Sequence, residues 1–127
     1  MRYMLLIYAD EQAWPYEERA TCFDESTQIA HDLSSKGQYL DASPLQPSST
    51  ATSIRVRDGK PLVTDGPFAE TREQLGGYFL IEARDLDEAM AVAARLPGAR
   101  RGTVEIRPVM EIGGLPAAEP LPTQRRA

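Results

Sequence analysis

Residues 64–78 hold the densest group of side chains whose types and spacing could support chemistry. Asp65, Gly66 and Pro67 form a turn sequence, and the apolar Phe68 follows it directly. A carboxylate at a strand end, beside a glycine-bearing turn and an aromatic ring, can be partly desolvated, which raises its pKa toward the range of a general base. Asp65 is therefore the candidate catalytic acid or base. In the alternative interpretation, Asp65 accepts backbone amide hydrogen bonds and braces its own turn.

The candidate ligand contacts flank this turn or lie on other predicted strands. Gly76 and Gly77 carry no side chain, which allows a backbone or a ligand to approach closely. Arg107 suits an anionic substrate through a two-pronged carboxylate contact, while Glu70 could pair with Arg72 or act as a second carboxylate. The alternative for each side chain is structural, as a packing ring or a solvated charge. The candidate ligand-binding residues are Tyr8, Gly66, Pro67, Phe68, Glu70, Gly76, Gly77, Tyr78 and Arg107.

Composition excludes several classes of site. One Cys and one His among 127 residues cannot form a Cys-based cluster or a multi-histidine site, so we expect no metal. The sequence has no glycine-rich phosphate loop, nucleotide-binding pattern or Ser-His-Asp order, so we expect no cofactor. A net charge of -5 and a pI of about 4.9 disfavour nucleic acid as a partner. Without an export signal or a membrane span, we expect a cytoplasmic protein.

Hydropathy patterns predict the elements that must position these residues. The apolar run over residues 1–8 predicts a central strand, and Pro15 followed by acidic residues predicts a helix that ends near residue 36. The pair Asp58 and Gly59, between alternating apolar residues, predicts a two-residue hairpin turn. Further strands are expected over residues 38–43, 77–83 and 103–110, and a second helix is expected to begin after its cap Asp85 and to end at Pro97.

The helical period predicts which side chains of the two helices face the core. The first helix is expected to bury the stripe Cys22, Phe23, Ser26, Ile29, Ala30 and Leu33, with Cys22 as an inert core thiol. The second helix is expected to bury Leu86, Ala89, Met90, Ala93 and Leu96. His31 falls opposite the first stripe, so it is expected at the surface.

This order of elements predicts an α+β ferredoxin-like sandwich with an inserted β-hairpin over residues 1–112. The helices of such a fold cover one face of the sheet and leave the other face bare. A second copy of the chain is the simplest cover, so we expect a homodimer. Residues 113–127 contain three Pro and no periodicity, and they are expected to form a C-terminal tail.

Three long blocks of the chain resemble the YCII-related family, specifically the branch named after its Asp-Gly-Pro-Phe motif. They are MRYMLLIYADE at the start, residues 37–97 around TDGPFAETREQLGGYFLIEA, and GTVEIRPVMEI near the end. The resemblance implies a ferredoxin-like fold that dimerises into an α/β barrel. It also implies genomic proximity to extracytoplasmic-function sigma factors for some members. More distant relatives are proposed to use a His-Asp pair near the start of the first helix, where this chain has Ser26.

Two hypotheses of function remain open. In the first, the chain is a small-molecule enzyme or binding protein with a pocket beside the Asp-Gly-Pro-Phe turn, in which Asp65 acts as acid or base and Arg107 anchors an anion. In the second, it is a non-enzymatic regulatory or accessory protein associated with a sigma factor. The first hypothesis rests on residues 65–68 and on the habit of such folds to bind ligands, and the second rests on the resemblance alone.

Overall fold

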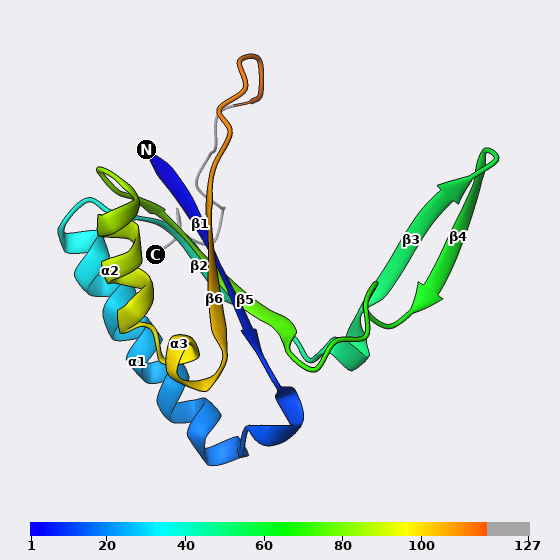
Figure 1. The fold of residues 1–127 in the computed structure, drawn as a ribbon, viewed down its shortest axis with the longest axis horizontal. Coiled ribbons are helices and arrows are strands. Elements are labelled where there is room, and N and C mark those ends of the chain that lie inside the picture. The colour runs from blue at the N-terminus through cyan, green and yellow to red at the C-terminus, as the bar shows by residue number, and fades with distance from the viewer. Residues whose placement is uncertain (117–127) are drawn as a thin grey trace, which may run out of the picture.

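A computed structural model describes residues 1–116 of the chain and shows one four-stranded sheet with its helices on one face, beside a separate two-stranded hairpin (Figure 1). The strand order of the sheet is β2-β5-β1-β6, and all three pairings are antiparallel. This order confirms the ferredoxin-like α+β fold. In chain order the elements are β1 Arg2–Ala9, η1 Glu11–Ala13, α1 Tyr16–Ser35, β2 Tyr39–Pro44, η2 Ser48–Thr50, β3 Thr52–Arg57, β4 Lys60–Asp65, β5 Gln74–Glu82, α2 Leu86–Arg95, α3 Pro97–Arg101 and β6 Thr103–Pro108.

The core lies between the helices and one face of the sheet. Side chains alternate between the two faces of a strand, so β1 and β5 each send every second residue toward the helices. Leu5 and Ile81 are fully buried there, against Leu33 of α1 and Leu96 at the end of α2. The apolar run over residues 1–8 is therefore the central strand that the sequence predicts, paired on both sides.

The first helix begins and ends as predicted, but its buried stripe is narrower. Pro15 precedes the first turn, and Gly37 follows the helix with a positive φ of 73°, a conformation that favours glycine. Ile29 and Leu33 are buried, whereas Phe23 is 47% exposed, so its predicted burial is wrong. The reason is geometric, since Phe23 borders an open hollow between α1 and β2, which leaves about half of its side chain uncovered.

The second helix has the predicted cap but buries a different face in the core. The Asp85 carboxylate accepts the Glu88 amide at 2.9 Å, as its position before the helix predicts. Leu86 and Met90 are about half exposed, so the prediction that both enter the core is wrong, and Val92 is buried in their place. α2 ends at Arg95 and Leu96 is extended, so the helix stops directly before Pro97 as predicted. A short helix that the sequence did not indicate, α3, then begins at Pro97, because a proline is tolerated in the first turn of a helix.

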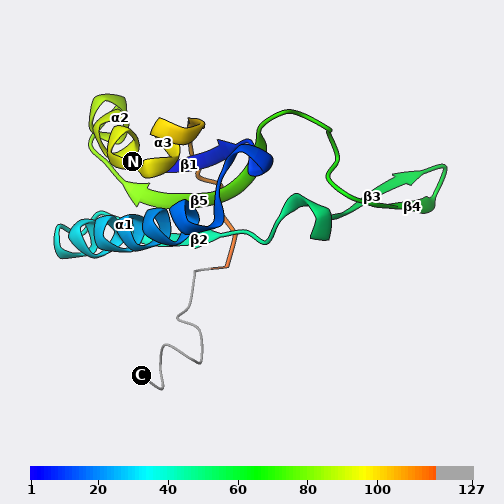
Figure 2. The same ribbon diagram turned by 90° about the horizontal axis from the view of Figure 1, so that it is seen from below.

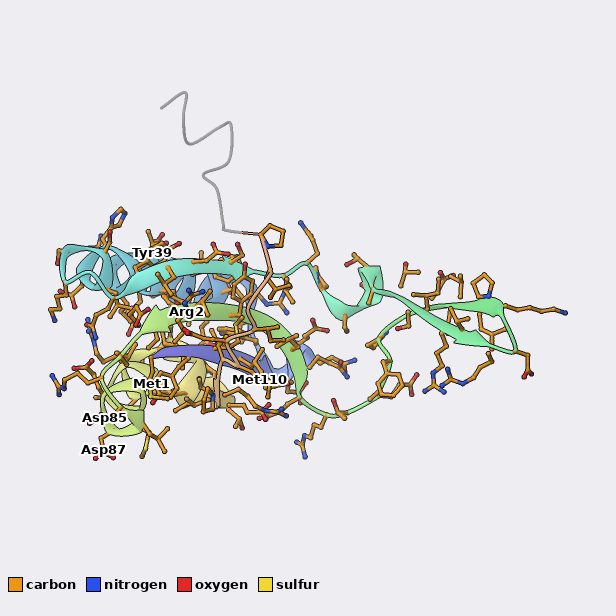
Figure 3. The ribbon with its side chains drawn as sticks, turned by 90° about the horizontal axis from the view of Figure 1, so that it is seen from above. Met1, Arg2, Tyr39, Asp85, Asp87 and Met110 are labelled. Carbon is orange, nitrogen blue, oxygen red and sulfur yellow. The ribbon has the colours of Figure 1, made fainter. Side chains whose placement is uncertain are left out.

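The predicted hairpin is present, but it stands apart from the sheet (Figures 1 and 2). Within the described part of the chain β3 and β4 pair only with each other. Asp58 and Gly59 take the positive φ values of 52° and 74° that such a turn needs. Figure 3 shows the side chains of the hairpin extending away from the body of the molecule. The hairpin is joined to the sheet by residues 45–51 and 66–73.

The second face of the sheet carries no helix among residues 1–116, because the helices lie together on the other side of the strands (Figure 1). We call it the open face, and it holds the half-buried side chains Met4, Leu6 and Tyr8 of β1 and Tyr78 and Leu80 of β5. The homodimer expected from this face stays a prediction. Within the described residues, no helix is both long enough and apolar enough to cross a membrane. The predicted tail over residues 113–127 lies outside the described residues from position 117 onward.

Candidate functional site at the base of the hairpin

Two adjoining hollows lie where the hairpin joins the sheet. The larger, of about 610 Å³, is mainly apolar, and the smaller, of about 420 Å³, is more polar. Ser48, Pro67, Thr71 and Gln74 line both hollows, so the two form one continuous surface. The apolar hollow is further lined by Tyr8, Leu45, Phe68, Ala69 and Leu75.

The Asp-Gly-Pro-Phe turn forms one wall of this surface. Gly66 takes a φ of 106°, which favours glycine, and its amide donates to the Ala51 carbonyl at 2.7 Å. The Ser53 hydroxyl donates to the Gly66 carbonyl at 2.8 Å, so the turn is tied to the start of β3. Phe68 is 74% exposed, and the Arg55 guanidinium lies 4.8 Å from its ring centroid. Pro67 and Phe68 thus join the hollow to the hairpin.

Acidic side chains after β1 form the opposite, polar wall. The Glu11 carboxylate accepts the Ser48 hydroxyl at 2.5 Å and the Ser48 amide at 2.9 Å. Asp10 caps η1 by accepting the Gln12 amide at 3.1 Å and lies 3.5 Å from the Arg72 guanidinium. The contacts of Glu11 with Ser48 and of Asp10 with Arg72 join segments that are 37 residues or more apart in the chain. The segment after β1 is therefore joined to one linker of the hairpin by hydrogen bonds at Ser48 and to the other by the ion pair with Arg72.

The structure does not place the carboxylate of Asp65 in either hollow. Asp65 is the last residue of β4, faces Thr52 across the hairpin and is exposed to solvent. Among residues 1–116 its carboxylate makes no hydrogen bond or ion pair with a side chain. The predicted catalytic role of Asp65 stays a prediction. Glu70 is exposed and lines the polar hollow, but the nearby Arg72 pairs with Asp10 instead of with Glu70.

The three predicted contacts on the sheet all lie on the open face but do not form one cluster. Tyr8 lines the apolar hollow, and its hydroxyl donates to Glu105 at 3.3 Å. The Arg107 guanidinium contacts the same carboxylate at 2.8 Å, which lowers the pKa of Glu105 and raises the pKa of Arg107. Tyr78 lies toward the other edge of the sheet.

The Tyr78 hydroxyl donates to Asp41 at 2.7 Å, and this hydrogen bond to a carboxylate raises the pKa of Tyr78. Gly77 serves the same sheet edge, because a Cβ on it would lie 3.0 Å from the Ser43 carbonyl oxygen. Gly77 thus allows close approach of β2, a structural role. Gly76 is more open, since its nearest atom to such a Cβ would be the Ile7 carbonyl oxygen at 3.9 Å.

A third hollow of about 400 Å³ separates α1 from β2. Phe23 and Ser26 line it from the helix, and Tyr39 and Phe79 line it from the sheet. His31 also lines this hollow and is exposed, as predicted. Cys22 is only half-buried, and desolvation raises the pKa of its thiol.

Glu11 and Ser48 are a hydrogen-bonded pair of site residues that the sequence did not indicate. Their hydrogen bonds span 37 residues, and neither position belongs to a recognisable motif. The available signal was the position of Asp10 and Glu11, directly after the central strand. Polar residues at strand ends are often placed at functional sites by the rigid sheet behind them.

Comparison with known proteins identifies relatives over nearly the whole chain. The family model described as YCII-related domain matches residues 1–113. The chain is also 36% identical over 114 residues to the uncharacterized protein R00369 of Rhizobium meliloti (strain 1021). This alignment covers 86% of the chain and 92% of the relative.

Proposed function

The chain belongs to the YCII-related domain family, and we propose that it binds a small molecule of mixed polarity beside its Asp-Gly-Pro-Phe turn. The observation that carries this proposal is the junction of an apolar hollow with a polar one at the base of the hairpin. Ligand sites are typically apolar concavities with a few convergent polar groups. The ligand class that fits is a small molecule with an apolar ring or chain and a hydrogen-bonding end.

The two walls of the site would contact different parts of the ligand. Phe68 and Leu75 offer apolar contact area, and Tyr8 adds an aromatic ring. On the polar side, the Arg72 side chain is 91% exposed and its Nε lies 3.5 Å from an Asp10 carboxylate oxygen. A guanidinium has five N–H donors, so Arg72 can also donate to an anionic or carbonyl group of a ligand. Arg107, the anion anchor expected from the sequence, is instead paired with Glu105.

Proton transfer by Asp65 is a second and separate part of this proposal. A carboxylate acts as a general base near neutral pH when burial or a like charge raises its pKa, and Asp65 is exposed in the single chain. Catalysis therefore requires a ligand or a second subunit to exclude water from the Asp65 turn. Binding can occur without this step, so the proposal separates binding at the hollow from turnover at Asp65.

A second subunit packed on the open face would supply part of that cover. Tyr8 and Leu75 lie at the end of the open face and also line the apolar hollow. We therefore propose a homodimer formed through Met4, Leu6 and Leu80. Sedimentation velocity at micromolar protomer concentration tests it, with Leu6→Lys expected to give monomer and a monomeric wild type contradicting it. A sigma-factor partner stays a prediction of the resemblance.

The binding proposal is tested by a screen of aromatic and aliphatic carboxylic acids, followed through amide chemical shifts of the full chain. Hits are expected to shift residues 67–75, and Phe68→Ala is expected to weaken them at least ~10-fold, about the ~1.4 kcal/mol of one lost apolar contact. Phe23→Ala, in the hollow between α1 and β2, is the matched control. Hits that shift residues 23–34 and respond only to Phe23→Ala would contradict the proposed location.

The catalytic part has a separate test. Once a ligand is converted, Asp65→Asn should reduce turnover while leaving the affinity within about twofold, because the substitution removes only the proton-accepting charge. Equal turnover by Asp65→Asn would exclude Asp65 as the acid or base and leave the binding site in place.

A further inference from the structure

The hairpin has too few contacts with its own chain to account for its length. Its two six-residue strands extend roughly 20 Å, and within residues 1–116 their backbones pair as strands only with each other. Among residues 1–116, the ties to the body are at its base, where Gly66 donates to Ala51 (Figures 1 and 2). An isolated two-stranded hairpin is marginally stable in water. The hairpin therefore needs a further surface to hold it in this form.

One face of the hairpin is apolar and uncovered. The register places Ile54 opposite Val63 and Val56 opposite Pro61, and cross-strand partners share a face. Ile54, Val56 and Val63 are 60% to 66% exposed. Contiguous exposed apolar side chains on a soluble protein mark an interaction surface. This face is thus suited to contact with another protein surface.

The charge of the hairpin indicates which kind of protein surface it would contact. Residues 52–65 contain Arg55, Arg57 and Lys60 but only two acidic residues, whereas the whole chain has 14 Lys and Arg against 19 Asp and Glu. Throughout residues 1–116 every other Lys and Arg except Arg19 lies in an ion pair with a carboxylate, and these three do not. The hairpin is a basic projection from an acidic molecule.

We propose that the hairpin is an arm that lies on a second copy of this chain, with Ile54, Val56 and Val63 packed against that copy. Arg55, Arg57 and Lys60 alternate to the opposite face of the hairpin, and their long side chains extend past the strand edges to that copy's carboxylates. The copy supplies the complementary charge, since Glu17 and Asp24 of α1 are exposed and outside every ion pair in residues 1–116. In a two-fold symmetric dimer each subunit extends its own arm over the partner and is contacted by the partner's arm, so both arms are covered.

Continuity with the open face supports the same partner. The linkers of the arm leave from the end of β2 and enter the start of β5, both strands of the open-face sheet. The arm starts at this end of the sheet and extends beyond it (Figure 1), so it can reach a second copy that packs on the open face. The inference shares the second copy with the proposed function but does not depend on a ligand.

Contact between the arm and the partner subunit would also affect the geometry of the proposed ligand site. Ala51 and Phe68, which line the apolar hollow, are fixed to the arm through the Gly66 hydrogen bond and the stacking of Arg55. The partner subunit would thus position one wall of the hollow.

Hydrogen exchange of the full chain, measured at two protomer concentrations about 100-fold apart, tests the arm directly. Amides of residues 52–65 are expected to be protected in the dimer and to lose at least ~10-fold protection on dilution, because an isolated hairpin opens readily. Ile54→Ser with Val56→Ser, and separately Arg57→Glu, are expected to weaken dimerisation at least ~10-fold in sedimentation velocity. Arg84→Glu on the exposed start of α2 is the matched charge control and should change it less than about twofold.

The remaining outcomes overturn the inference in distinguishable ways. A dimer that is weakened by Leu6→Lys but unaffected by the arm variants would show that the open face alone pairs the subunits. Protection that does not change on dilution, and disappears when residues 117–127 are removed, would assign the arm to its own chain's tail. Protection that appears only after addition of another protein would assign it to a different partner. Loss of ligand shifts in Phe68→Ala reports on the hollow alone, so it does not affect this conclusion.

Discussion

Gly102 lies in the turn between α3 and β6, and β1 passes so close to it that no side chain fits. A Cβ on Gly102 would lie 2.0 Å from the Tyr8 carbonyl oxygen and 3.0 Å from the Ala9 Cα. Both contacts are backbone atoms, so the strain of Gly102→Ala can be relieved only by moving β1 or the turn itself. Overpacking typically costs ~1–3 kcal/mol, and contacts to backbone belong at the upper end of that range.

The expected loss can be converted to a melting temperature. Unfolding entropy is about 2.1 cal/mol/K per residue, so for a chain of this length 1 kcal/mol corresponds to about 4 °C. A loss of about 2 to 3 kcal/mol therefore predicts that Gly102→Ala melts about 8 to 12 °C below the wild type. Gly113→Ala is the matched control, because a Cβ there would have no atom within 4 Å.

Circular dichroism melts at one fixed protomer concentration, with urea unfolding as a second measure, test the prediction. The fixed concentration matters because subunit association changes an apparent melting temperature. A Gly102→Ala variant that melts within about 2 °C of Gly113→Ala would refute the close packing of the turn on β1. It would also remove the support that this turn gives to the position of Tyr8.

Three further substitutions test the core, a charge cluster and a helix cap. Leu33→Ala should lower the free energy of unfolding, measured in urea, by ~2–5 kcal/mol because Leu33 is fully buried. Phe23→Ala should lower it by less than about 1 kcal/mol. Equal losses would contradict the observed buried face of α1. Arg95, and then Lys36, lower the pKa of Asp32, so stabilisation from this carboxylate is complete above its ordinary pKa and is lost as the pH falls through the lowered folded value. Arg95→Gln should therefore raise the pKa of Asp32 in an NMR titration and reduce the loss of unfolding free energy at acid pH. An unchanged pKa would contradict the pairing of Asp32 with Arg95. Asp85→Ala should cost about 1 kcal/mol in urea unfolding through loss of the α2 cap, and a neutral result would show that the Glu88 amide finds another acceptor.

Local sequence determined the parts of this protein that depend on near neighbours. The hairpin turn at Asp58 and Gly59 needs positive φ, the cap of α2 needs a short acceptor at Asp85, and the end of α1 needs Gly37. Each requirement is satisfied within a few residues, so the residue types alone indicate the element. The central strand follows in the same way from a continuous apolar run, and the order of these elements indicates the ferredoxin-like sheet.

Tertiary structure alone decided how those elements meet. Which face of α2 is buried depends on its rotation against the sheet, so Val92 enters the core while Met90 does not. The carboxylate that meets the base of the hairpin is Glu11, held by Ser48 from 37 residues away, whereas Asp65 of the turn motif points into solvent. The hairpin itself was predictable, but its separation from the sheet was not, because strand pairing between distant segments depends on a contact geometry that local pattern does not encode.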